Sequence, residues 1–217
     1  MNHVPAWTEI VLILVVVLDF FLLASSRLRA VIRGAAIQGA LLSLLPLFMA
    51  GRVELGHVLL LSLGALLVKG IAIPWLLVWA IREAAIRREV EPLVGFVPSL
   101  VLGVLGVGLA FALSSAMPLP ATERHGYLVP TALSTVWTGL LLVVSRRKAV
   151  SQVIGFLVLE NGVFVFGMLL SDFMPAMVEA GVLLDLFAAV FVMGIVMFDI
   201  NREFSSLDTE KLSALKD

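Results

Sequence analysis

Long apolar runs alternate with short polar segments along all 217 residues of the chain. Each run approaches or exceeds the roughly 20 residues that an α-helix needs to cross the hydrocarbon core of a bilayer. The runs cover about residues 7–24, 34–50, 57–81, 93–116, 127–145, 149–171 and 177–200. This pattern predicts an all-α, polytopic membrane protein with about seven transmembrane helices.

Lys and Arg residues fall unevenly on the segments between these runs. With seven spans, the side that holds segment 25–33 carries twelve Lys and Arg residues, and the opposite side carries only Arg52 and Arg124. Because cytoplasmic segments are enriched in Lys and Arg, we expect the N-terminus outside and the C-terminus in the cytoplasm. Positive charge follows the first run and does not precede it, which is typical of a retained span and not of a cleaved signal peptide.

Three parts are expected along the chain. The segment 117–126 contains two prolines and separates a four-helix N-terminal transmembrane part, 1–126, from a three-helix transmembrane part, 127–200. A polar cytoplasmic tail, 201–217, follows. The sequence shows no inverted repeat of the kind that many self-sufficient transporters contain, so a subunit role is favoured.

Composition supports a membrane protein and narrows its chemistry. The chain is 61% hydrophobic and 14% charged, with a mean hydropathy of +1.10, whereas soluble domains average about 45–50% apolar and about 25% charged residues. A net charge of −1 gives no basic bias toward nucleic acid, so no nucleic-acid partner is expected. Lipid is the expected partner of the apolar spans. Cys is absent and the three histidines lie at span ends or in loops, so we expect no iron–sulfur, nickel–iron or haem cofactor in this chain. The sequence contains no nucleophile–base pair and no metal-ligand cluster, so no active site of its own is expected.

Glu160 lies near the centre of the sixth run and is followed directly by Asn161. An ionisable side chain at the bilayer centre costs roughly 2.5–3.5 kcal/mol on insertion scales, and residues that remain there are usually functional. One interpretation is that Glu160 accepts and donates protons along a hydrated path. The other is that it stays protonated and hydrogen-bonded to a neighbouring helix.

Lys69 lies at the middle of the third run. A lysine at this depth needs a carboxylate partner or a water-filled pocket. Asp19 and Glu160 are the candidate partners, and the sequence alone does not pair them. Lys69 is either a charge relay in a proton path or one half of a structural ion pair.

Three aspartates complete the set of candidate proton-path residues. Asp185 lies within the seventh run, and Asp199 lies near its cytoplasmic end, where a hydrated end residue is an equally good interpretation. Asp19 lies five residues from the end of the first run. This position is within reach of interfacial water, so a hydrated residue is favoured for Asp19 over a role in the proton path.

Several short motifs distinguish the last three runs. They are Arg146-Arg147, Ile154-Gly155, Leu159-Glu160-Asn161-Gly162, Gly194-Ile195, Asn201-Arg202 and Leu207-Asp208. In this order, residues 127–217 resemble the small three-helix K-type subunit of respiratory complex I, and the C subunit of multisubunit cation/proton antiporters shares the pattern. The two glutamates of the K-type pattern correspond to Leu157 and to a position near Val190, so Glu160 and Asp185 lie close to those positions and not on them.

The motif Leu159–Gly162, together with four additional N-terminal spans, makes the full chain similar to the hydrogenase-4 component E family. That resemblance implies a non-catalytic subunit of a redox-driven, proton-translocating complex in the inner membrane of a prokaryote. Its implied partners are antiporter-like membrane subunits and a soluble redox arm carried by other chains. Glu160 would be the central protonatable group, with Asp185 and Lys69 as relay partners. The alternatives are a subunit of a cation/proton antiporter and a purely structural scaffold.

Overall fold

The computed structural model describes residues 6–49, 55–83, 90, 92–117, 126–169 and 194. All regular secondary structure within these ranges is helical, which confirms the all-α fold class. The helices are α1 (Ala6–Ala24), α2 (Leu28–Ser43), α3 (Leu45–Met49), α4 (Leu55–Ala65), the π-helix η1 (Leu66–Ala72), α5 (Ile73–Glu83), α6 (Phe96–Ala116), α7 (Leu128–Ser145) and α8 (Ala149–Leu169).

Six segments of the described residues are long and apolar enough to cross a membrane. They are Trp7–Ala24, Leu28–Phe48, Val58–Trp79, Phe96–Ala116, Leu128–Ser145 and Val150–Leu169. The chain is therefore a multi-pass membrane protein in which the first six predicted runs form helices. The seventh predicted span, 177–200, which carries Asp185 and Asp199, lies outside the described residues except for Gly194. The seventh span and the orientation of the termini stay predictions.

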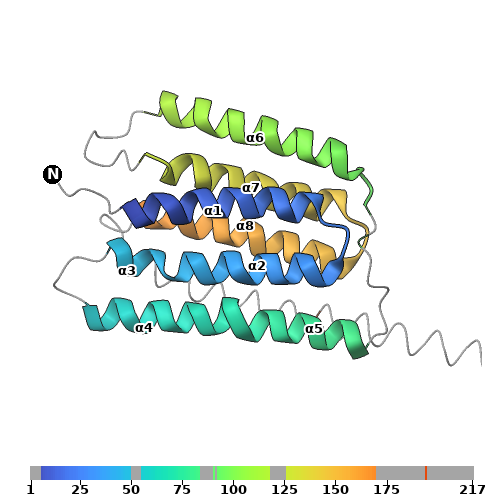
Figure 1. Ribbon diagram of the computed structural model, residues 1–217, viewed down its shortest axis with the longest axis horizontal. Helices are drawn as coiled ribbons and strands as arrows, with labels where there is room; N and C mark the ends of the chain where they lie inside the picture. Colours follow the sequence, from blue (N-terminus) through green and yellow to red (C-terminus); the bar gives the residue numbers. More distant parts are fainter. Residues whose placement is uncertain are drawn as a thin grey trace, which may run out of the picture.

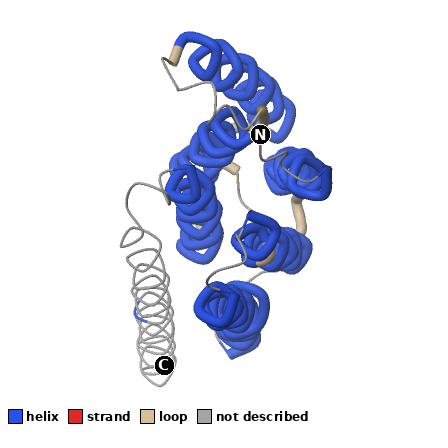
Figure 2. The backbone as a smooth tube through the Cα atoms, turned by 90° about the vertical axis from the view of Figure 1, so that its left-hand side faces the viewer, coloured by secondary structure: helices blue, strands red, loops and turns tan. Residues whose placement is uncertain are grey.

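The helices lie side by side with roughly parallel axes (Figure 1). α6 forms one edge, and α4, η1 and α5 together form the opposite edge. Figure 2 shows the same arrangement with the helices seen nearly end-on. α7 packs along α8 and α6, α1 contacts α2, α6 and α7, and α2 contacts α8 and η1. The middle of the bundle is therefore made by α1, α2, α7 and α8.

α2 begins several residues earlier than the sequence predicted. The expected span began at residue 34, but the helix begins at Leu28 and includes Arg29 and Arg33. The reason is the spacing of Leu28, Val31, Ile32 and Ala35, which are all buried and recur three to four residues apart. The helix is interrupted just before Pro46, since α2 ends at Ser43 and α3 begins at Leu45.

Glycines allow α7 and α8 to approach until their backbones touch. A Cβ added at Gly155 on α8 would lie 2.7 Å from the backbone nitrogen of Val143 on α7, and one added at Gly162 would lie 2.6 Å from that of Val136. Both distances are far inside normal van der Waals contact, so only glycine fits at these positions. Small residues permit this close approach of helices in membranes.

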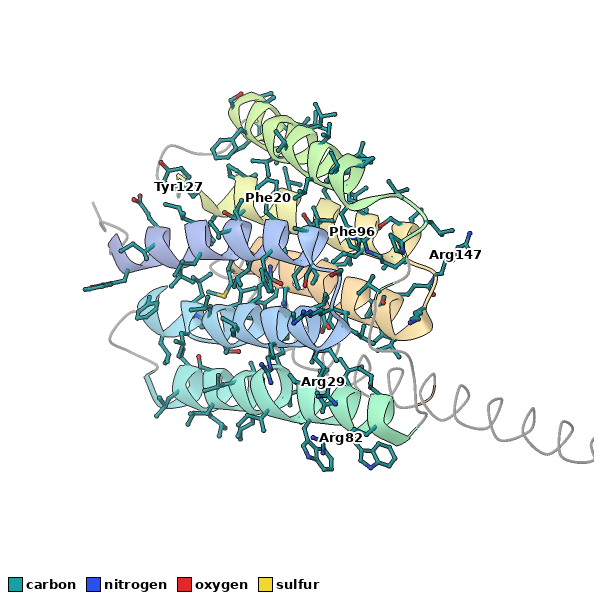
Figure 3. The ribbon with its side chains drawn as sticks, turned by 45° about the vertical axis from the view of Figure 1, so that its right-hand side comes forward. Phe20, Arg29, Arg82, Phe96, Tyr127 and Arg147 are labelled. Atoms are coloured by element: carbon teal, nitrogen blue, oxygen red, sulfur yellow. The ribbon has the colours of Figure 1, made fainter. Side chains whose placement is uncertain are left out.

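Three polar segments meet at one end of the bundle. The backbone N–H of Val90 donates to the carbonyl of Ser26 over 2.8 Å, and that of Leu93 donates to the carbonyl of Ser145 over 2.7 Å. Ser26, Val90, Leu93 and Ser145 therefore lie at the same end of the bundle. Figure 3 shows Arg147 toward this end and Tyr127 at the opposite end of the bundle.

Two apolar clusters fill the bundle, one toward each end. The cluster near the polar segments includes Leu22, Leu28 and Ile154. The cluster toward the other end includes Leu12, Leu45 and Val165. In α1, α2, α7 and α8 the stretch between the two clusters contains buried polar side chains, and these form the candidate site.

Candidate functional site: a buried polar layer

Several buried polar side chains lie between the two apolar clusters, and we call six of them the polar layer. They are Asp19 on α1, Gln38 on α2, Lys69 on η1, Thr135 on α7, and Glu160 and Asn161 on α8. None of the six is more than 8% exposed. Polar and charged groups at this depth are costly without partners. The partners of these side chains therefore determine what the layer can do.

A chain of hydrogen bonds connects five of these side chains across four α-helices and η1. Lys69 Nζ donates to Asn161 Oδ1 over 3.2 Å, and Asn161 Nδ2 donates to Gln38 Oε1 over 3.2 Å. Gln38 Nε2 donates to Asp19 Oδ1 and Thr135 Oγ1 donates to Asp19 Oδ2, each over 2.8 Å. The amine of Lys69 is therefore linked to the carboxyl group of Asp19 through two side-chain amides.

Asp19 lies in the protein interior and not at the membrane surface. It is 2% exposed, and both of its carboxyl oxygens accept hydrogen bonds from neighbouring helices. The expectation that Asp19 reaches interfacial water is therefore wrong. The physical reason is that α2 and α7 both pack against α1 and supply Gln38 and Thr135 as partners, which replace the hydrogen bonds that water would have made.

Lys69 is positioned by an irregular turn of its helix. In η1 the backbone bonds span five residues, and the N–H of Ile73 donates to the carbonyl five residues earlier. Pro74, which has no N–H to donate, follows directly. Single π-turns of this kind often occur at functional sites. A Cβ added at Gly39 on α2 would lie 2.9 Å from Lys69 Cβ, so this glycine allows the turn to approach α2 closely.

Lys69 and Glu160 line the same small cavity between α2, η1, α5 and α8. Its volume is about 20 Å³, and a cavity of roughly 10–15 Å³ is enough for one water molecule. Asn161 contributes a third polar side chain to the wall, and the remaining lining is mostly apolar, including Ile73 and Leu157. The space is therefore large enough for one water molecule, and Lys69, Glu160 and Asn161 are the polar residues that line it.

The ring of Phe164 borders the amine of Lys69. Lys69 Nζ lies 5.1 Å from the centroid of that ring, within the range in which an aromatic face stabilises a cation. The positive charge of Lys69 is thus met by an aromatic ring, by an amide oxygen and by a cavity that also holds a carboxyl group.

Arg146 is a second buried cation, but it lies at the end of α7 and outside the polar layer. Its Nη2 donates to the carbonyl of Leu23 over 2.9 Å, its Nη1 donates to that of Val94 over 3.2 Å, and its guanidinium lies 5.2 Å from the centroid of the Phe96 ring. Burial lowers the pKa of Arg146 from its ordinary value, and an arginine still remains protonated at physiological pH. Its role in this geometry is to fasten the ends of α1 and α7 to the start of α6.

The structure brings three of the five candidates from the sequence, Asp19, Lys69 and Glu160, into one layer. Asp185 and Asp199 lie outside the described residues. Gln38 and Thr135 were not among the candidate residues predicted from the sequence. Among the residues that the structure describes, no group of three His, Asp or Glu side chains is placed to hold a metal ion, so the chemistry of the layer is that of protonatable groups and amides.

The fold and the polar layer together define a multi-pass membrane protein with ionisable groups at the centre of its helix bundle. The chain is 35% identical over 191 residues to the uncharacterized protein Rv0085 of Mycobacterium tuberculosis, with 88% of this chain and 87% of the relative aligned. It is 29% identical over 160 residues to hydrogenase-4 component E of Escherichia coli K12 and of Shigella flexneri, with 74% of each chain aligned.

Residues 127–217 match the family described as NADH-ubiquinone/plastoquinone oxidoreductase chain 4L. No solved structure matches the chain at a significant level. The chain is similar to hydrogenase-4 component E over about three quarters of its length, and its C-terminal part carries the chain 4L region. Glu160 and Asn161 lie inside the chain 4L region, whereas Asp19, Gln38 and Lys69 come from the N-terminal helices, which that match does not include.

Proposed function

We propose that this chain is a membrane subunit of a complex I-like, redox-driven complex, and that Glu160 is the central protonatable group of a proton path through it. The similarity to hydrogenase-4 component E and the chain 4L match support the first part of this proposal. The redox centres then lie in other chains, in keeping with a sequence that has no Cys to bind them.

The observation that carries the second part is the cavity shared by Glu160 and Lys69. The two groups come from different helices, and both lie near the middle of their candidate spans. A carboxyl group and an amine across a water-sized space are able to exchange a proton through one water molecule. Because intramembrane ionisable groups usually mark ion or proton pathways, this pair is the strongest candidate in the described part of the chain.

The setting of this path follows from the same proposal. The complex lies in the inner membrane of a prokaryote, with antiporter-like membrane subunits beside this chain and a soluble redox arm on the cytoplasmic side. Asp185 and Asp199 of the predicted seventh span continue the path toward the cytoplasm. The N-terminus is outside and the C-terminus inside, so the end of the bundle that carries Arg147 faces the cytoplasm.

Replacing Glu160 with glutamine tests the proton role inside the purified complex. Glutamine keeps the shape of the side chain but holds no exchangeable carboxyl proton. We expect the E160Q complex to assemble and to keep electron transfer to an artificial acceptor, while coupled proton movement in vesicles falls by roughly 10²-fold, the low end of what a positioned proton-transfer group contributes. The matched control is E9Q, which makes the same chemical change at an exposed position in the first turn of α1.

Each of the other outcomes of this experiment would favour a different function. Full proton coupling in an assembled E160Q complex would overturn the proton role. Loss of assembly alone, with normal coupling in the complexes that do form, would favour the structural scaffold. Proton movement that follows Na⁺ or K⁺ gradients without any electron donor would favour the antiporter alternative.

A further inference from the structure

The hydrogen-bond chain between Lys69 and Asp19 has a single direction. Each step is a donor on the Lys69 side and an acceptor on the Asp19 side, from Lys69 Nζ through Asn161 and Gln38 to Asp19 Oδ1. The hydrogen-bond chain therefore runs from Lys69, which is cationic when protonated, to Asp19, which is anionic when deprotonated. The dipoles of the two amides between them are aligned with both charges.

The direction follows from the chemistry of the two ends. A charged lysine amine is a donor only, so it must face the oxygen of Asn161 and not its NH₂ group. That choice turns Asn161 Nδ2 toward Gln38, which must then accept with Oε1 and donate with Nε2 to Asp19. Thr135 donates to the second oxygen of the same carboxyl group. With both oxygens accepting, the surroundings of Asp19 suit a carboxylate, which is the state that best completes a chain starting from a cation.

Among the described residues, few other charged side chains lie on the helices that carry this hydrogen-bond chain. Apart from Asp19, Lys69 and Glu160, they are Glu9 in the first turn of α1 and Arg29 and Arg33 in the first two turns of α2. The interior is of low dielectric, so charges within the polar layer influence each other more strongly than charges at the surface. Asp19 is therefore the one carboxyl group that reaches Lys69 through hydrogen bonds that are defined in the described residues.

We propose that Asp19 is a positioning residue that stabilises the charged form of Lys69 through the amides of Gln38 and Asn161, and so controls the electric field at Glu160. The N-terminal helices, which supply Asp19, Gln38 and Lys69, thereby regulate the carboxyl group of the chain 4L region. This inference deepens the proposed function, because it names the regulator of the same proton site.

Infrared spectroscopy of the purified complex tests this coupling directly. The carboxyl stretching band of Glu160 is assigned by its loss in E160Q, at a pH where the group is protonated. Because the frequency of this band responds to the local electric field, a less charged Lys69 moves it to higher frequency. We expect this shift in D19N, and a shift in the same direction in Q38L, which interrupts the chain while leaving Asp19, Lys69 and Glu160 in place.

The control is S134A, which removes a buried hydroxyl on α7 that bonds only within its own helix, to the carbonyl of Thr131. The Glu160 band of the S134A complex should stay at the wild-type frequency. A band that is unmoved in both D19N and Q38L would overturn the inference, and a shift in D19N without one in Q38L would overturn the role of the amides. If the D19N complex fails to assemble, the frequency of the Glu160 band in Q38L alone decides whether the inference holds. Failure of the proposed function is read separately, from proton movement in E160Q, so the two results are distinguishable.

Discussion

At the scale of single residues, the hydrogen bond of Lys69 that is defined among the described residues goes to Asn161 and not to either of the two carboxyl groups that the sequence suggested. Lys69 Nζ donates to Asn161, and it is linked to Asp19 through amides and to Glu160 across a cavity. The sequence identifies buried ionisable groups because charge inside an apolar run is costly. It does not pair them, because Lys69 and Asn161 are 92 residues apart and their meeting depends on how two helices rotate and pack.

Gln38 and Thr135 illustrate the same limit. Gln38 lies at the centre of its span and is fully buried, so an amide in the middle of an apolar run was a usable signal. Thr135 carried no such signal, because a threonine in a membrane helix often bonds its own backbone. Only the packing of α7 against α1 reveals that its hydroxyl donates to Asp19.

Arg146 allows a matched test of the bundle end. R146K keeps the positive charge, but a single amine cannot serve the two carbonyls, of Leu23 and Val94, that the guanidinium fork reaches. We expect a loss of about 1–3 kcal/mol in the free energy of unfolding, the cost of leaving a buried carbonyl without a donor. Thermal unfolding of the purified protein in detergent measures it. R147K, at the exposed neighbouring position, should change stability by no more than about 0.5 kcal/mol.

At the scale of elements, the apolar runs predicted the helices well, because a run of this length in lipid has to satisfy its backbone hydrogen bonds internally. The predicted sixth span, 149–171, corresponds closely to α8. The sequence analysis placed the start of α2 too late, because Arg29 and Arg33 interrupt the apolar run. The apolar face of this first part of α2 shows only in the helical spacing of its apolar residues. The π-turn at Lys69 was also missed, because a proline inside a run predicts an irregular helix without specifying its hydrogen-bond pattern.

The glycines between α7 and α8 support a prediction at this scale. G155A places a methyl group 2.7 Å from the backbone nitrogen of Val143, so the two helices must separate. We expect a destabilisation of about 1–3 kcal/mol, typical of overpacking in a close-packed interior. Thermal unfolding in detergent is again the measurement. G167A is the control on the same helix, because a Cβ there meets nothing within 4 Å, and equal losses in both variants would contradict the packing of α7 on α8.

At the scale of the whole molecule, the alternation of basic segments predicted which segments share an end, and the bonds from Val90 to Ser26 and from Leu93 to Ser145 agree with it. The packing of the helices does not determine which end faces the cytoplasm, because that orientation depends on how the chain inserts into the bilayer. The two halves of the polar layer also meet only at this scale, since Glu160 and Asn161 are supplied by one part of the chain and Asp19, Gln38 and Lys69 by the other.

The absence of Cys makes the orientation easy to test. Single cysteines at two exposed positions, Y127C and R147C, mark opposite ends of the bundle (Figure 3). We expect a membrane-impermeant maleimide to label Y127C in intact spheroplasts and R147C only in inverted vesicles. The cysteine-free parent chain is the control for background labelling. The reverse pattern would place the Arg147 end outside and invert the proposed direction of the path.

Co-purification is the most direct test of whether this chain serves in a redox-driven membrane complex. A tag on the C-terminus and a mild detergent allow the partners to be identified by mass spectrometry. We expect recovery of large antiporter-like membrane subunits together with cysteine-rich soluble subunits that carry redox centres. Recovery of the chain alone, or with membrane subunits and no redox subunit, would contradict this role.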